Sequence, residues 1–457
     1  MMRKRIIPAV LLFLISIIAF VSCNDSVSVS APVEVEKGPI TSILQEDYGT
    51  REYLINKLRL YSIYNDYERT ESTIKADISS YLNTFHGSSD GTKALPDYME
   101  PEMILMESFP VTEDGSIRLE VYDIIDQNDN RCFIIIPTDK RIGDFLYLSD
   151  GGSWETAKDV EIIQEMLKSM LLYSKDVIEL SNSLETTSGT KSISIKSHIT
   201  VEDNTSVTIP TVNWSQEHDF NDAIEAFYGK NYPVGCGAVG IGIIMAHWKQ
   251  PAQFIDIDFY QGDNSKVTLS ALKSKWNVLS TWNGQYDWNS ILAENEYGRY
   301  QRAALLLDIA DACDSIYSLE GTGTYIDSYV ACFDHFGFNW EYYENAVKDE
   351  TTIFPLVKSL ENNRPVLMSG YGIKGGKTVG HTFVIDGAEM TTETRKQYSI
   401  DEDSFSYMNL TEIQSLKYHA NLGWYDVNQN GWYNPDSVAS EYGFSCEFCF
   451  IDIYPKD

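Results

Sequence analysis

Cys236 has the local sequence of a nucleophile. Gly235 and Gly237 flank it and leave its sulfur accessible to a substrate, and an apolar, helix-like run over Val239–Trp248 follows at once. The N-terminus of a helix carries positive partial charge, which favours a thiolate over a thiol. A cysteine that only packs inside a helix would fit the same stretch, so the nucleophile hypothesis depends on a partner base elsewhere in the chain.

Two of the seven histidines are the better candidates for that base. A cysteine nucleophile needs a group that holds its proton as imidazolium and later protonates the departing amine. His381 follows a glycine and opens a strand-like stretch, Gly380–Gly387, which predicts an imidazole at the rim of a rigid sheet. His419 lies two residues before Asn421, so the two side chains would share one face of a strand. His419 could therefore be a base or only a neighbour of the site.

The remaining histidines have weaker cases. His247 would lie on the same helix as Cys236, about 16 Å along its axis at 1.5 Å per residue, which is too far to touch the thiol. His218 lies in a predicted loop and stays an open alternative. Three others are interpreted as packing, surface or linker residues: His86, His198 and His335.

The order and spacing of the candidates match a known arrangement. His381 follows Cys236 by 145 residues, and Asn421 lies further on. This is the Cys, His, Asn order of papain-like peptidases, with a similar gap. In that arrangement the asparagine orients the imidazole.

Together these segments resemble the streptopain family of papain-like cysteine peptidases, a group of secreted bacterial enzymes. The resemblance covers most of the second half of the chain, and segments further upstream resemble the inhibitory propeptide of the family. The segments that carry it are Phe133–Arg141 and Leu148–Gly152 for the propeptide, and Asn213–Gln216, Pro233–Ala238, Arg364–Leu367, Gly380–Gly387 and His419–Trp424 for the enzyme.

The resemblance implies a role for each matching residue. Cys236 would attack a peptide carbonyl as a thiolate paired with His381, and the Gln216 side chain would join the Cys236 backbone N–H in stabilising the oxyanion. Asn421 would hold the imidazole, and Trp424 would shield the site from water. The resemblance also implies a papain-like catalytic domain, with a helical part and an antiparallel sheet. An α+β propeptide domain would precede it and act as an intramolecular inhibitor. No cofactor and no metal are expected.

The chain departs from the family pattern close to the histidine. Leu422 stands where the family has its first tryptophan after the asparagine, and Tyr425-Asp426 replaces a Gly-Gly pair. The helix after the cysteine carries Gly240 and Gly242, where alanine and glutamine are more usual in the family. Loss of the tryptophan removes an aromatic wall beside the histidine, which leaves open a weakened or inactive relative.

The first residues predict export and stand apart from the fold. Three basic residues, Arg3 to Arg5, precede an apolar run over Ile6–Val21 that is short for a membrane span. Cys23 follows in a pattern that resembles a bacterial lipoprotein signal, although Phe20 stands where leucine is usual. We expect lipidation of Cys23, with an ordinary cleaved signal peptide as the alternative. The protein would reach the outer membrane or cell surface, or be released after maturation.

Composition divides the chain into three parts. Residues 1–22 are the predicted signal peptide, residues 23–190 the tether and inhibitory propeptide domain, and residues 191–457 the peptidase domain. The polar stretch Glu185–Ser192 is the predicted flexible linker, where proteolysis would separate the two domains.

Periodicity predicts helices early and strands late in the last part, which indicates an α+β fold with an antiparallel sheet. Its helices are predicted at Val239–Trp248, Arg299–Tyr317, Ile326–Phe336 and Thr351–Asn362, and its strands at Pro365–Ser369, His381–Asp386, Lys417–Asn421 and Gly443–Ile453. Further upstream we expect helices at Ile43–Leu60 and Glu155–Leu184 and strands at Ser116–Ile124 and Cys132–Pro137.

Composition also limits the partners. The net charge of −32 argues against nucleic acid, since little in the chain would neutralise phosphates. Apart from Cys23 and Cys236 an odd number of cysteines remains, so core cysteines with at most one disulfide are expected. Asp426–Gly431 matches the start of an EF-hand loop, but Ser437 stands where a bidentate glutamate is required, which favours a turn over a calcium site.

Three functions remain. The residues favour a lipid-anchored cysteine endopeptidase, made as a zymogen, that hydrolyses protein or peptide substrates. The second is a catalytically weakened relative that acts as a surface binding protein, which Leu422 favours. The third is another thiol acyl-transfer enzyme, such as an amidase or a transpeptidase.

Overall fold

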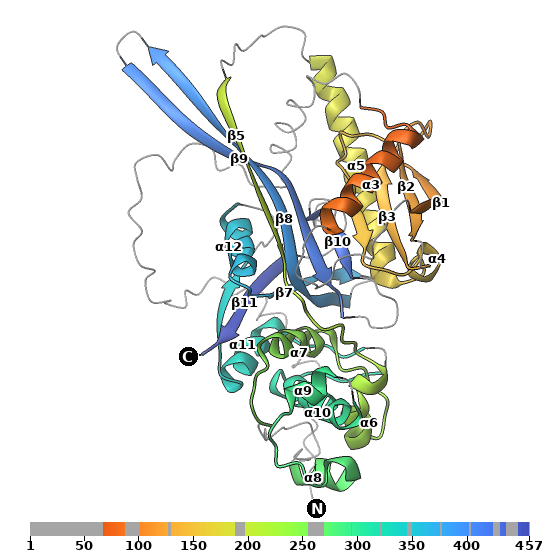
Figure 1. The fold of residues 1–457 in the computed structure, drawn as a ribbon, viewed down its shortest axis with the longest axis vertical. Coiled ribbons are helices and arrows are strands. Elements are labelled where there is room, and N and C mark those ends of the chain that lie inside the picture. The colour runs from red at the N-terminus through yellow and green to blue at the C-terminus, as the bar shows by residue number, and fades with distance from the viewer. Residues whose placement is uncertain are drawn as a thin grey trace, which may run out of the picture. The chain divides into compact units, whose positions relative to one another are not determined.

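The structure is a computed structural model, drawn in Figure 1, in which Glu46–Asp457 form one compact unit. It describes residues 67–86, 101–126, 129–187, 197–254, 269–293, 295–319, 321–344, 350–374, 377–401, 404–423, 430–435 and 447–456. The predicted signal peptide, Cys23, the helix expected at Ile43–Leu60, Trp424 and most of the predicted linker lie outside the described residues.

The N-terminal part has a four-stranded sheet between two helices. Side chains alternate between the faces of a strand. Leu119 and Val121 of β2 pack in one core with α5, whereas Tyr122 and Ile124 pack in another with α3, so the two helices cover opposite faces of the sheet (Figure 1). The elements are α3 (Glu71–His86), β1 (Glu102–Pro110), β2 (Arg118–Ile125), β3 (Arg131–Pro137), β4 (Tyr147–Ser149), α4 (Trp154–Ala157) and α5 (Glu161–Thr187).

The single helix predicted over Glu155–Leu184 is two helices in the structure. Trp154 and Ala157 are buried and fix the short α4 against the sheet, and a turn separates it from α5. The strands predicted at Ser116–Ile124 and Cys132–Pro137 correspond to β2 and β3.

The second part begins with helices and ends with strands. Its helical elements are η1 (His218–Phe220), α6 (Asp222–Tyr228), α7 (Cys236–Trp248), α8 (Leu269–Lys275), η2 (Asn277–Leu279), α9 (Trp288–Leu292), α10 (Glu296–Ala312), α11 (Ile326–His335) and α12 (Glu350–Glu361). Its strands are β5 (Ser197–Thr208), β6 (Phe338–Tyr343), β7 (Val366–Lys374), β8 (Lys377–Asp401), β9 (Ser404–Asn421), β10 (Gly431–Tyr433) and β11 (Glu447–Pro455).

One antiparallel sheet runs through both parts. Its strand order is β1-β2-β3-β4-β10-β9-β8-β7-β11-β6, and β5 pairs with the outer half of β8. The short strand β10 joins the two parts, because it pairs with β4 on one side and with β9 on the other. The strands before the predicted linker and the strands after it therefore belong to the same sheet.

The strands predicted at His381–Asp386 and Lys417–Asn421 are the inner ends of a longer hairpin. In the structure β8 and β9 stay paired as far as Asp401 and Ser404 (Figure 1). The outer half of this hairpin is rich in polar residues and lacks the apolar run on which the strand prediction depended.

The inner sheet has helices on both faces. Leu367 and Val384 belong to the core of the helical layer that contains α7 and α10. Val366 and Ile385, their neighbours in sequence, belong to the core that includes residues of α5 and α12. This arrangement confirms the predicted α+β class, with a helical part and an antiparallel sheet.

Among the described residues, no helix combines the length and the apolar character needed to cross a membrane.

Candidate active site

Cys236 is the first residue of α7, so the helix begins earlier than the predicted Val239. Gly235 precedes it at a φ of 99°, a backbone conformation that side chains disfavour, and a Cβ there would lie 3.1 Å from Thr322. This turn directs the chain into the helix and leaves the sulfur at its N-terminus. None of the five described cysteines forms a disulfide. The Cys236 side chain is partly exposed, whereas the other four are buried: Cys132, Cys313, Cys332 and Cys449.

The two glycines that depart from the family pattern permit close packing of α7. A Cβ at Gly240 would lie 2.7 Å from Leu367 on β7, and one at Gly242 would lie 2.7 Å from Leu306 on α10. Both distances are shorter than carbon atoms allow, so the helix lies against the strand and its neighbouring helix only because these positions lack side chains. The departures therefore serve the placement of Cys236.

His381 on β8 hydrogen-bonds the sulfur of Cys236. Burial alone would raise the pKa of the Cys236 thiol, but the hydrogen bond and positive charge of His381 outweigh it. The backbone N–H groups of Thr382 and Gly237 also donate to the sulfur, and the net effect lowers the pKa of Cys236 below its ordinary value. The site therefore favours a thiolate next to an imidazolium.

A backbone carbonyl fixes the other side of the His381 ring. His381 Nε2 lies 3.0 Å from the carbonyl oxygen of Leu422. A carbonyl can only accept, so Nε2 carries a proton and Nδ1 is left to exchange a proton with Cys236. The ring of Phe383 stacks beside the imidazole at 5.9 Å between centroids.

Asn421 does not make the expected contact with the imidazole. Its Nδ2 donates to Thr211 Oγ1 and to the Val212 carbonyl, both at 2.9 Å, and its Oδ1 accepts from the Gly423 N–H at 3.3 Å. Asn421 lies in β9 opposite Val384, so its side chain faces this loop and not the ring. It supports the backbone on either side of Leu422, and the Leu422 carbonyl takes the position that the sequence assigned to the asparagine.

The backbone of Gln216 is hydrogen-bonded to the segment that leads into Cys236. Gln216 is buried, and its carbonyl accepts a hydrogen bond from the N–H of Val234 at 2.8 Å, two residues before Cys236. Trp214, from the same segment, is buried against α7 at Gly242. The oxyanion role of the Gln216 side chain stays a prediction, and Trp424 lies outside the described residues.

His419, the competing candidate base, is held between two carboxylates. Its Nδ1 bonds the fully buried Asp386, and its Nε2 lies 2.8 and 2.9 Å from the two oxygens of Asp150. Both ring nitrogens of His419 therefore bond carboxylates, whereas His381 bonds the sulfur of Cys236 and a backbone carbonyl. We call Asp150, His419 and Asp386 the carboxylate–histidine cluster.

The cluster connects the two parts of the sheet. Asp150 directly follows β4, whereas His419 and Asp386 lie on β9 and β8. Burial alone would lower the pKa of His419, but the charges and hydrogen bonds of Asp150 and Asp386 raise it from 6.5 to about 9. His419 is therefore a buried cation at neutral pH. Sequence analysis overlooked this arrangement, although an aspartate inside the apolar stretch after His381 was a signal for it.

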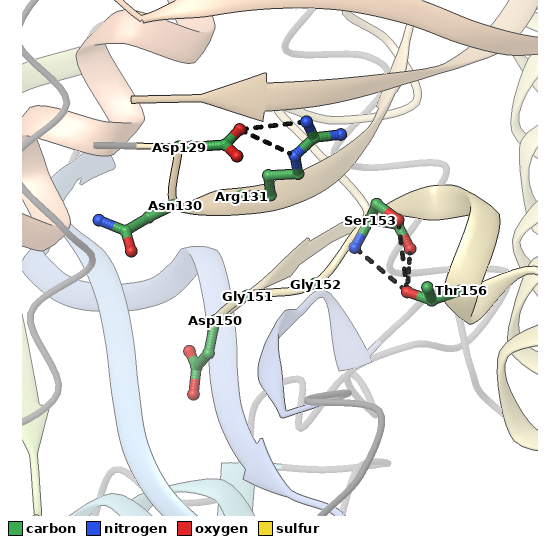
Figure 2. Close-up of a pocket in the computed structure, with 8 residues that line it drawn as sticks. All are labelled: Asp129, Asn130, Arg131, Asp150, Gly151, Gly152, Ser153 and Thr156. Carbon is green, nitrogen blue, oxygen red and sulfur yellow. Dashed lines mark hydrogen bonds and ion pairs between the residues drawn. The ribbon is translucent and has the colours of Figure 1, made fainter. Parts of the chain in front are cut away.

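A polar hollow of about 450 Å³ lies beside the Asp150 segment, and none of the predicted catalytic residues line it. Figure 2 shows its lining side chains, with Arg131 paired to Asp129 and with the Asp150 carboxylate directed away from both. Asp150 lines the hollow, and its carboxylate oxygens bond His419.

Only Asn430 and Gly431 of the EF-hand-like segment lie within the described residues, so the choice of a turn over a calcium site stays a prediction. Its end has a structural role. Asn430 Oδ1 accepts from the Leu422 N–H at 2.8 Å, and Gly431 opens β10. Asn430 thereby helps to fix the carbonyl that holds His381.

Comparison with known proteins agrees with this geometry. Residues 214–433 match the Peptidase C10 family model. The match covers slightly less than half of the chain. Streptopain from Streptococcus pyogenes is 24% identical to the chain over 277 residues, covering 56% of this chain and 66% of streptopain. The match thus spans slightly less than two thirds of that relative.

Two solved structures also resemble the chain. Prointerpain A of Prevotella intermedia matches with a TM-score of 0.49 and 18% identity, over 78% of this chain and all of that fragment. Active interpain A, described as a cysteine protease, matches with a TM-score of 0.37 and 20% identity, over 54% of this chain and 94% of its own. At TM-scores below 0.5 neither likeness bears on the assignment.

The segment that matches the family model contains each candidate of the catalytic site that the sequence predicted: Gln216, Cys236, His381, Asn421 and Trp424. The carboxylate–histidine cluster, by contrast, needs Asp150, which precedes the matched segment.

Proposed function

We propose that the chain is a cysteine endopeptidase. One observation carries the proposal: the sulfur of Cys236 begins a helix, its pKa is lowered, and it hydrogen-bonds an imidazole whose other nitrogen is fixed by the Leu422 carbonyl. A thiolate beside an oriented imidazolium is the arrangement that acyl transfer from a peptide bond requires. The peptidase C10 match over residues 214–433 supports the same reaction.

The chemistry follows from these groups. The Cys236 thiolate attacks the peptide carbonyl carbon, and the carbonyl oxygen becomes an oxyanion, for which Gln216 and the Cys236 N–H are the proposed donors. The His381 imidazolium gives its proton to the amine as the C–N bond breaks, leaving a thioester. Water then loses a proton to His381 and attacks the thioester, which releases the acid and restores the thiolate and imidazolium.

The N-terminal part is proposed to be an inhibitory propeptide, which can leave the peptidase part only after the linker is cut. Its support is the contact surface itself. β4 pairs with β10, and a Cβ at Gly431 would lie 2.2 Å from the Leu148 carbonyl oxygen, so the two backbones approach closely. The Asp150 contact with the buried His419 adds an ion pair at the same junction.

Export and lipid anchoring are proposed from the N-terminal sequence. The basic residues, the apolar run and Cys23 fit a lipoprotein signal. The protein would then act at the outer membrane or the cell surface on protein or peptide substrates.

A weakened relative that binds proteins is the alternative, because Leu422 replaces a tryptophan of the family. The Leu422 contact with His381 is made by its backbone carbonyl, which every residue type supplies. The replacement therefore leaves the orientation of the imidazole intact, and this favours the enzyme. The third possibility, acyl transfer to amines, uses the same residues and differs only in the acceptor.

The test is self-processing of a purified chain that starts after the signal, beginning at residue 24. We expect cleavage within residues 185–196 and labelling of Cys236 by a thiol-directed epoxide. Cys236→Ala should abolish both, whereas Cys132→Ala, which alters a buried cysteine, should abolish neither. Absence of both processing and labelling in the unaltered chain would leave the binding-protein alternative. Product formation only with added amines would indicate a transferase.

A further inference from the structure

Three buried hydroxyl groups from three different elements meet beneath the catalytic pair. Thr382 Oγ1 on β8 lies 3.0 Å from Tyr329 Oη on α11 and 2.8 Å from Ser369 Oγ on β7. Each of the three residues is at most 4% exposed. Buried hydroxyls that satisfy one another fix the rotamers of their side chains.

Tyr329 also touches the helix that carries the nucleophile. A Cβ at Gly237 would lie 2.3 Å from Tyr329 Oη and 2.9 Å from its ring. No side chain fits between the tyrosine and the first turn of α7, so the ring lies directly against the backbone next to Cys236. Tyr329 therefore contacts both the helix of Cys236 and the strand of His381.

Thr382 is the link from this contact to the chemistry. It follows His381 in β8, and its backbone N–H donates to the sulfur of Cys236. Its methyl group faces α7, because a Cβ at Gly240 would lie 3.6 Å from Thr382 Cγ2. The methyl group packs against the helix, and Tyr329 and Ser369 hold the hydroxyl. These contacts together fix the rotamer of Thr382.

We propose that Tyr329 is a positioning residue for the Cys236–His381 pair, acting through Thr382. The Tyr329 hydroxyl, together with that of Ser369, fixes Thr382 so that its N–H points at the sulfur, while the tyrosine ring sets the spacing of α7 from β8. This inference rests on the proposed function, since it concerns the same thiolate. The proposal gives Tyr329 on α11 a role in the reaction, although α11 supplies no reacting group.

The charge state of Tyr329 agrees with such a role. Burial, followed by the charge of Cys236, raises the pKa of Tyr329 well above its ordinary value. The hydroxyl keeps its proton and can donate to Thr382 Oγ1, and it does not compete with Cys236 for ionisation.

The test measures the pKa of the Cys236 thiol from the pH dependence of its alkylation by iodoacetamide, read by mass spectrometry of the peptide that contains Cys236. The measurement uses the full chain and needs no peptidase activity. Tyr329→Phe and Thr382→Val each remove one hydroxyl at nearly constant volume, and both should raise the thiol pKa by about half a unit to one unit.

Two further variants separate positioning from packing. Thr382→Ser keeps the hydroxyl and loses the methyl. The pKa of the Cys236 thiol in this variant should lie within about 0.2 units of its value in the unaltered chain. Tyr286→Phe is the matched control, because Tyr286 belongs to the same hydrophobic core and its hydroxyl has no hydrogen-bond partner among the described residues. It should leave the thiol pKa unchanged.

An unchanged thiol pKa in Tyr329→Phe and Thr382→Val would overturn the proposal and make the hydroxyls a packing device only. A thermal melting curve shows whether each variant folds. If one does not, Ser369→Ala replaces it, and the pKa of the Cys236 thiol should rise by the same amount. An ordinary thiol pKa in the unaltered chain would instead contradict the proposed function, so the two failures are distinguishable.

Discussion

Two contacts at Cys236 and His381 account for the proposed chemistry: the hydrogen bond between the two side chains and the bond from His381 Nε2 to the Leu422 carbonyl. The first lowers the pKa of the thiol, and the second fixes the tautomer that serves it. Neither contact requires the aromatic wall that Leu422 lacks. At Leu422 the chain differs from the family pattern in the side chain, whereas the contact with His381 is made by the backbone carbonyl.

The first prediction concerns the dependence of thiol reactivity on pH. Because the pKa of Cys236 is lowered, the thiolate persists below the pH at which an ordinary thiol is protonated, and it is lost only as the pH falls through the lowered pKa. His381→Ala removes the main cause, so Cys236 alkylation at pH 6.5 should slow by about tenfold or more. Stopped-flow or quenched alkylation of the two chains checks this. Equal rates would exclude His381 as the partner.

A second prediction concerns Asn421, whose side chain supports the loop at Leu422. Asn421→Ala removes the hydrogen bonds that its side chain makes with Thr211, Val212 and Gly423. It should lower the free energy of unfolding by about 1–3 kcal/mol. Because the Leu422 carbonyl remains, kcat should fall by only about tenfold, whereas His381→Ala should cost at least about a thousandfold. Thermal melting and steady-state hydrolysis of a peptide measure both effects. Equal losses in the two variants would assign Asn421 a direct role.

At the scale of elements, some features were predictable and others were not. The sequence predicts α7 as a helix behind Cys236, since an apolar run after a glycine turn is a local signal. It does not predict that Leu422 holds His381, because a backbone carbonyl has no residue type to recognise. Nor could it choose firmly between His381 and His419. That choice depends on Asp150, which pairs with His419 through a strand contact some 270 residues away in sequence.

The third prediction concerns the junction of β4 and β10. Asp150→Asn removes one of the two carboxylates that keep His419 charged and breaks a mostly buried ion pair; removal of one partner from such a pair costs about 3–5 kcal/mol. The N-terminal part should then bind the peptidase part less tightly, and self-processing should accelerate several-fold. Asp129→Asn, which alters an exposed carboxylate on the hollow nearby, is the matched control and should not change the rate. A timed digest resolved by electrophoresis compares the chains. Identical rates for Asp150→Asn and the unaltered chain would remove the cluster from the inhibitory contact.

At the scale of the whole molecule, a sheet that runs through the N-terminal and C-terminal parts has consequences if the predicted linker is cut. β4 remains paired with β10 whether or not the chain is continuous, so the cleaved N-terminal part should stay bound. The net charge of −32 works against this association, and the carboxylate–histidine cluster offsets part of the repulsion locally.

The fourth prediction is that this association depends on pH. The pKa of His419 is raised to about 9 in the folded protein from 6.5, so its stabilising contribution is complete below pH 6.5 and is lost as the pH rises through about 9. After linker cleavage the two parts should elute together from a sizing column at pH 7 and separate increasingly between pH 8 and 10. Asp150→Asn should shift the separation to lower pH. Separation that is independent of pH over this range would contradict the assignment of His419 as the titrating group.

The central claim is that Cys236 hydrolyses peptide bonds with His381 as its proton carrier. The most direct measurement is steady-state hydrolysis of an unstructured fluorogenic peptide by the chain from residue 24, compared with Cys236→Ala and with His381→Ala. The account predicts turnover by the unaltered chain and a loss of at least about a thousandfold in kcat/KM in each variant. Hydrolysis that survives Cys236→Ala would contradict it.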